Sequence, residues 1–154
     1  DLGGAAQAFV QVLQIDPTNA KAIAGYARVA LQSGEPDQAR QILAMAEGAK
    51  DPELDSVRAA LELQASVPYD LAVFQRRLEA DPEDHEARYE FAKGLAGLGR
   101  AGDAVEHLLY IVERDREWNE QSARKQLLKI FEAEGPASDV AKAGRRKLSA
   151  LLFS

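Results

Sequence analysis

The sequence predicts an all-α fold, a superhelix of about nine antiparallel helices. Apolar residues recur at helical spacing along the 154 residues, and no segment sustains the alternating pattern of a β-strand. A short acidic phrase also recurs, with spacings of 35, 30 and 34 residues between Asp16, Asp51, Asp81 and Asp115. Periods of this length are typical of helical repeat proteins. We therefore expect stacked pairs of helices.

The composition is that of an ordinary soluble globular protein. Hydrophobic residues make up 46% of the chain and charged residues 29%, and no run approaches the roughly 18 apolar residues of a membrane span. The net charge of −6 argues against nucleic acid as a partner, since contacts to phosphates need a basic surface. The chain has no cysteine, which excludes disulfides, thiolate metal sites and thiol redox chemistry of its own. We expect a single cytoplasmic domain over residues 1–154.

The acidic phrases mark the boundaries between helical pairs. Proline removes a backbone donor and cannot lie inside a helix, while Asp, Asn or Thr beside it can cap the next helix. Gly34 and Gly99 divide two of the periods into helix, turn and helix. The predicted sections are an unpaired second helix over 1–15, a repeat over 16–50, a short irregular repeat over 51–80, a repeat over 81–114 and a terminal helix pair over 115–154.

The first section lacks its partner. Residues 1–15, with Ala5, Phe9 and Val12 on one face, are expected to form the second helix of a pair whose first helix is absent. An isolated amphipathic helix of this length is marginal unless it packs on a neighbour. We therefore expect that this chain was cut from a longer protein.

The section over 51–80 departs from the regular pattern. It is shorter than the others, and Asp70 stands where a small residue is usual. We expect a short connection over 66–69 and an irregular packing angle between its two helices.

Small residues occupy facing positions in the two regular repeats. Ala27 pairs with Ala39, and Ala92 pairs with Ala104, which lets the two helices of each pair approach closely. This arrangement of small and large residues resembles the tetratricopeptide repeat. The resemblance implies a superhelix whose concave face commonly binds peptides and whose repeat positions serve packing.

The only tryptophan, Trp118, lies in a polar phrase at the last boundary. Arg116 occupies the place that Pro17 and Pro82 hold in earlier phrases, so Trp118 marks a structural junction. Trp118, preceding an Asn119 cap, is expected to pack as a hydrophobic staple near the start of the following helix. A partly exposed indole is also a candidate hot spot for binding.

Three motifs that suggest a bound ligand have simpler structural explanations. The glycines of 97–102 match a dinucleotide-binding pattern, but a helix precedes them instead of a strand. His85 and His107 are 22 residues apart, and neither has a second ligand at metal-binding spacing. The acids of 81–86 lack the glycine of a calcium loop and complement a helix dipole. No cofactor, metal or catalytic residue is predicted.

Two surfaces are candidates for binding other proteins. The inner-face positions of the repeats hold basic and aromatic residues. The C-terminal helix carries a basic cluster and a hydrophobic end, and it caps the array, docks on another protein, or does both. The candidates are Lys21, Arg28, Tyr89 and Lys93 on the inner face, and Arg145, Arg146, Lys147, Leu151, Leu152 and Phe153 on the C-terminal helix.

Several phrases together are similar to the C-terminal half of the bacterial thioredoxin-like co-chaperones called chaperedoxins. They are 81–90, Gly99-Arg100 with Ala104, 115–119 with 123–125, and 145–148. In that family a thioredoxin-fold domain precedes the repeats, and the protein holds unfolding clients during oxidative stress and passes them to the chaperonin. The resemblance implies that this chain binds unfolded clients, the chaperonin or other chaperones, and that the thioredoxin-fold domain is missing from it.

The same helical pattern also fits a generic tetratricopeptide scaffold that assembles an envelope or secretion complex. A signal peptide upstream of the chain, in place of a thioredoxin fold, would favour that function. An enzyme is not supported, because no nucleophile and base pair, metal cluster or phosphate loop is found in the sequence.

Overall fold

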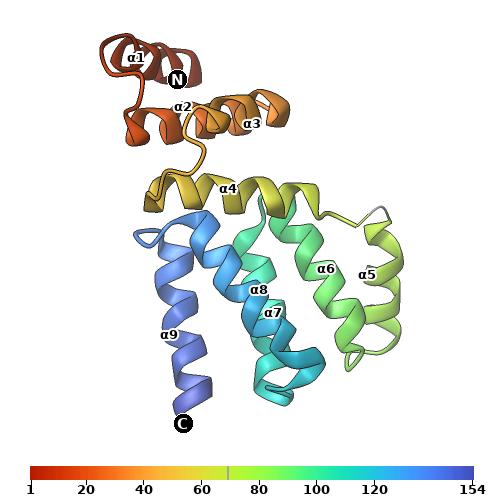
Figure 1. The fold of residues 1–154 in the computed structure, drawn as a ribbon. Coiled ribbons are helices and arrows are strands. Elements are labelled where there is room, and N and C mark those ends of the chain that lie inside the picture. The colour runs from red at the N-terminus through yellow and green to blue at the C-terminus, as the bar shows by residue number, and fades with distance from the viewer. Residues whose placement is uncertain (69) are drawn as a thin grey trace. The chain divides into compact units, whose positions relative to one another are not determined.

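The computed structural model describes residues 1–68 and 70–154, which are helical with short turns and contain no β-strand. The all-α prediction is therefore confirmed. Tyr69, at the end of the predicted 66–69 connection, lies outside the described residues. The helices shown in Figure 1 are α1 (Leu2–Ile15), α2 (Ala20–Gln32), α3 (Pro36–Ala44), α4 (Pro52–Ala65), α5 (Leu71–Ala80), α6 (His85–Gly97), α7 (Ala101–Arg114), α8 (Trp118–Glu134) and α9 (Asp139–Phe153).

Contacts along the chain define two compact units, residues 1–61 and residues 62–154, and the boundary falls within α4. We call them the N-terminal unit and the C-terminal unit. Each buries its own set of apolar side chains. The assignment of the chain to one domain with five sections stays a prediction.

The core of the N-terminal unit forms between α2, α3 and the first part of α4. Ala27 and Ala39 are fully buried, so α2 and α3 approach closely at the predicted positions. Ile23 and Leu54 belong to the same core. Helix α1 packs on α2, with Leu13 against this core, but none of its residues is fully buried. Because so short a helix is marginal alone, α1 depends on this contact.

The C-terminal unit is built around the pair α6 and α7. Ala92 and Ala104 are fully buried in it, as Ala27 and Ala39 are in the other unit. Leu108 of α7 and Phe131 of α8 are also completely buried. Helix α9 packs along α7 and α8 and buries Leu148 (Figure 1).

The turns inside the two regular pairs have the same geometry. Gly34 and Gly99 have φ angles of 81° and 85°, in the left-handed region that glycine adopts without a steric penalty. In the second turn the amide of Arg100 donates to the carbonyl oxygen of Leu95 at 2.8 Å, and the equivalent bond in the first turn measures 2.9 Å. This is the Schellman ending of a helix. The glycines of 97–102 therefore end one helix and begin the next.

All four acidic phrases begin with the same turn. The carboxylates of Asp16, Asp51, Asp81 and Asp115 each accept a hydrogen bond from the amide two residues later, at 3.3, 2.9, 3.0 and 3.2 Å. In the phrases that begin at Asp16 and Asp81, the third residue after the aspartate is Asn19 or Asp84. Its side chain caps the next helix by accepting a bond from the amide three residues later, at 2.9 and 3.0 Å.

Trp118 is the third residue after the aspartate in the phrase that begins at Asp115, the position that Asn19 and Asp84 hold in theirs. Its indole nitrogen is a donor only, so it cannot accept the bond that a cap requires. The next three residues, Asn119, Glu120 and Gln121, have left-handed conformations with φ of 48°, 57° and 63°. The prediction of an Asn119 cap is therefore wrong, because a capping residue has extended backbone and Asn119 does not.

Replacing Gly144 by Ala is expected to lower the free energy of unfolding by roughly 1–3 kcal/mol, because a Cβ there would collide with the fully buried ring of Phe131. Gly102→Ala is the control. A Cβ at Gly102 meets nothing within 4 Å, so this change should raise the free energy of unfolding by about 0.5–1 kcal/mol. Urea denaturation followed by circular dichroism measures both. Equal effects would contradict the close packing of α9 on α8.

Glu120→Gly is expected to raise the free energy of unfolding by roughly 0.5–1 kcal/mol. Glycine adopts the left-handed backbone conformation of this position without steric strain, and this gain exceeds the cost of the greater chain entropy that glycine gives to the unfolded state. Lys125, an exposed residue in the regular part of α8, is the matched position. Lys125→Gly should lower the free energy by about 1 kcal/mol. The same denaturation measurement distinguishes them, and a loss of stability in both variants would argue against the left-handed turn.

Candidate functional site

Trp118 lies against two aromatic rings of α6. The centre of its ring is 5.4 Å from that of Tyr89 and 6.1 Å from that of His85, the second pair meeting edge to face. All three side chains are half-buried. We call these three residues the aromatic cluster. Its contacts cross the junction between the predicted sections 81–114 and 115–154, and they hold the start of α8 against α6.

Lys93 extends the aromatic cluster along α6. It lies one turn after Tyr89, and its ammonium group is 5.4 Å from the centre of the Tyr89 ring and 3.5 Å from the Glu90 carboxylate. Burial, and then the charge of Glu90, raise the pKa of Tyr89, so its hydroxyl is protonated at neutral pH and can donate a hydrogen bond. The surface thus combines aromatic faces with a hydroxyl and a cation, which suits a polypeptide segment with apolar side chains.

Two arginines enclose a tyrosine between α6 and α7. The guanidinium of Arg88 is 3.6 Å from the centre of the Tyr110 ring, and that of Arg114 is 3.3 Å from it. Since both lie so close to one ring centre, they occupy opposite faces of the ring. The hydroxyl of Tyr110 donates to the Glu83 carboxylate at 2.6 Å, which lowers the pKa of Glu83 and raises that of Tyr110. The four side chains lock α6 and the turn before it onto α7.

Arg88 is charged although it is only 9% exposed. Its guanidinium donates to the carbonyl of Pro82 and to Nδ1 of His107, both at 2.9 Å. Because Arg88 is a donor only, Nδ1 of His107 must carry a lone pair, and the proton of the neutral ring lies on Nε2. Burial, and then the charge of Arg88, lower the pKa of His107.

Arg88 is not among the predicted site residues, although its position in the helical pattern of α6 marks it. Arg88 lies four and seven residues before Ala92 and Leu95, so it falls on the buried stripe of α6. A charge on such a stripe needs partners within the fold. Tyr110 carries no comparable signal, because its role appears only when α6 and α7 are packed together.

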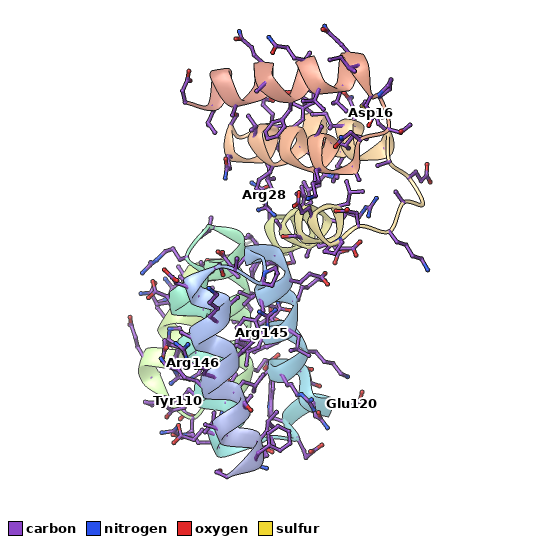
Figure 2. All side chains as sticks on the ribbon, turned by 90° about the vertical axis from the view of Figure 1, so that its left-hand side faces the viewer. Asp16, Arg28, Tyr110, Glu120, Arg145 and Arg146 are labelled. Atoms are coloured by element: carbon purple, nitrogen blue, oxygen red, sulfur yellow. The ribbon has the colours of Figure 1, made fainter. Side chains whose placement is uncertain are left out.

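The two predicted site residues of α2 have different surroundings. Lys21 is exposed in the first turn of the helix. Arg28 is half-buried and directed toward α4, where it donates to the hydroxyl oxygen of Ser56 at 2.7 Å (Figure 2). Arg28 thus links α2 to α4, and a role of either residue in partner binding stays a prediction.

The basic residues of α9 make different contacts. Lys147 forms an ion pair with Glu106 of α7 at 2.6 Å. The guanidinium of Arg145 lies 5.4 Å from the ring centre of Phe131 on α8, while Arg146 is exposed. Figure 2 shows Arg145 and Arg146 along the same helix. Two of the three predicted basic residues therefore contribute to the packing of α9.

The end of α9 is held by a residue of the preceding junction. The guanidinium of Arg116 donates to the carbonyl oxygens of Leu151 and Leu152, which satisfies groups that have no partner inside the helix. Both leucine side chains are half-buried, whereas Phe153 is 83% exposed. Phe153 is the most accessible of these three predicted docking residues.

The acidic phrase before α6 stabilises the start of this helix. Asp84 caps the helix, and together with Glu86 it pairs with Arg77 at 3.1 and 3.0 Å. Across residues 1–68 and 70–154, no group of three or more His, Asp or Glu side chains is placed to hold a metal ion. In the same part of the chain, no helix has both the length and the apolar character needed to cross a membrane.

His107 should make stability depend on pH. Its pKa is lowered in the folded state, so the unfolded chain takes up a proton first as the pH falls below about 6.5. The stabilisation is complete above that pH and is lost as the pH falls toward the folded-state pKa. His107→Asn keeps an acceptor for Arg88 without this titration. Urea denaturation at about pH 7.5 and pH 5.5 should show a smaller loss of stability in the variant, and an equal loss would contradict the assignment.

Two tetratricopeptide repeat family models match the chain, one over residues 64–153 and the other over residues 1–61. Between them they cover nearly all of both units. No protein with curated information matches the chain.

A solved structure is also similar to the chain, a domain of protein VP0806 from Vibrio parahaemolyticus whose function is described as unknown. The two sequences are 25% identical, the similarity covers 98% of this chain and 92% of that one, and the TM-score is 0.52. The similarity therefore extends over the whole helical array. Family models, buried alanine pairs and repeated turns all agree, and the chain belongs to the tetratricopeptide repeat family.

Proposed function

We propose that this chain is a non-catalytic protein-interaction module and that the aromatic cluster, together with Lys93, contacts the partner. Tetratricopeptide repeat domains generally bind other proteins, which supports a protein partner. The observation that carries the proposal is that Tyr89 and Trp118, from different helices, form one half-buried aromatic surface. Tryptophan and tyrosine are enriched among the few residues that supply most of the binding energy at protein interfaces.

The partners in this proposal are unfolding proteins and the chaperonin, and the whole protein is a thioredoxin-like co-chaperone of the chaperedoxin type. The combination of phrases at 81–90, 115–125 and 145–148 supports this assignment. An unfolding client exposes apolar and aromatic side chains, and these can pack on the accessible parts of the half-buried rings without displacing a buried core. Exposed Arg146 and Phe153 of α9 are a second contact within the same proposal, toward the chaperonin.

Trp118 provides a direct test, because it is the only tryptophan in the chain. A reduced and carboxymethylated ribonuclease, which is unfolded and contains no tryptophan, is the client. Binding should shift the emission of Trp118 to shorter wavelength, since the client removes water from the indole. Tyr89→Ala should weaken binding of the fluorescently labelled client by about tenfold, as measured by fluorescence anisotropy.

Leu98→Ala is the control variant, because Leu98 is a 60% exposed apolar residue outside the aromatic cluster, and its affinity should equal that of the wild type. Binding that leaves Trp118 emission unchanged and tolerates Tyr89→Ala would place the client elsewhere. Failure to bind the client or to co-sediment with a chaperonin would reject the co-chaperone assignment and leave the general role in protein interaction.

A further inference from the structure

Two adjoining cavities that are open to solvent lie along helices α7 and α9 of the C-terminal unit. One has a volume of about 320 Å³ and is lined by Leu109 and Leu151 among others. The second has a volume of about 270 Å³ and includes Val105 in its wall. Glu106 and Lys147 line both cavities, so the two meet at the ion pair between these residues. We call the two cavities together the α7–α9 groove.

The groove follows the axis of α7. Its wall on this helix is made by Gly102, Val105, Leu109 and Glu113, residues spaced three and four apart. This spacing places them on one face over about 17 Å, the length of three helical turns. Figure 2 shows Tyr110, another wall residue, beside α9. A groove of this length between two helices can accept a third helix of similar length.

The rim of the groove is acidic. Among its described lining residues are three acids, Glu106, Glu113 and Asp139, and one base, Lys147, which give a formal charge of −2. Both acids are already paired within the chain, Glu106 with Lys147 at 2.6 Å and Glu113 with Arg114 at 3.7 Å. Their side chains are 62% and 64% exposed, so a base of a ligand can reach either carboxylate. They are seven residues apart, which places the two carboxylates about 10 Å apart on the same face of α7.

The accessible apolar part of the wall comes from the half-buried Val140, Ala143 and Leu151 of α9, because Val105 and Leu109 of α7 are almost fully buried. Such a surface, bordered by acids, is complementary to a helix with an apolar face bordered by bases. Lys147 already shows the pairing that such a base would make, because its ammonium group crosses the groove to Glu106. This ion pair is more than half exposed on both sides, so its replacement by a ligand amine involves little burial of charge.

We propose that the α7–α9 groove binds an amphipathic helical segment of a partner protein, with Leu-like side chains toward α7 and α9 and Lys or Arg residues beside them. A basic residue of the segment takes the place of Lys147 at Glu106, and another pairs with Glu113. This surface is separate from the aromatic cluster on α6 and the start of α8, so the proposal does not depend on client binding there.

The probe for the test is a fluorescein-labelled peptide of Leu and Lys in amphipathic helical order, and its counterpart contains Glu in place of Lys. The full chain should bind the Leu and Lys peptide, and the Glu counterpart should bind at least about tenfold more weakly. The double variant Glu106→Gln with Glu113→Gln should weaken the Leu and Lys peptide by about tenfold in fluorescence anisotropy.

Two further variants separate the groove from general attraction to an acidic chain. Glu132→Gln with Glu134→Gln removes the same charge from exposed positions of α8 and should leave the affinity unchanged. Gly102 lines the groove and a Cβ there meets nothing within 4 Å, so Gly102→Phe should fill the groove without changing the charge and should weaken binding. Equal loss in the α8 variant, no loss with Gly102→Phe, or no binding of the peptide would overturn the proposal. Tyr89→Ala, which lies outside the groove, should not affect this peptide.

Discussion

The close approach of α6 and α7 at Ala92 and Ala104 is the constraint on which the C-terminal unit depends. Both side chains are fully buried, and a larger residue at either position would separate the helices, because protein interiors leave no spare volume. Only at this separation can the guanidinium of Arg88 reach both the ring of Tyr110 and Nδ1 of His107. The packing of small residues and the polar network therefore form one interlocked unit.

The last junction replaces a local interaction with a tertiary one. Asn19 and Asp84 begin their helices with a side-chain oxygen that accepts an amide, whereas Trp118 begins α8 without one. The start of α8 is instead held by the ring contacts of Trp118 to α6, and three residues with left-handed backbone follow it. Trp118 thus leaves the start of α8 without a side-chain cap, and the same residue completes the aromatic cluster.

The two proposed surfaces of the C-terminal unit differ in chemistry. The aromatic cluster presents ring faces with one nearby cation, Lys93, and it suits an unfolded polypeptide segment with apolar side chains. The α7–α9 groove is open, partly apolar and acidic at its rim, and it suits a preformed amphipathic helix. Because Arg116 closes the last turn of α9, the same junction that carries Trp118 also shapes one end of the groove.

The sequence by itself determined the helical class, the boundaries at the acidic phrases, the glycine turns and the facing alanines, because these depend on residues close together in the chain or on a simple period. It also placed Arg116 in the position of Pro17 and Pro82, and so Trp118 at a junction, although Asn119 was wrongly expected to cap the helix. The tertiary structure alone decided which side chains meet across helices, such as Tyr110 with two arginines and Lys147 with Glu106. Such contacts depend on the separation and rotation of packed helices, which no local pattern specifies.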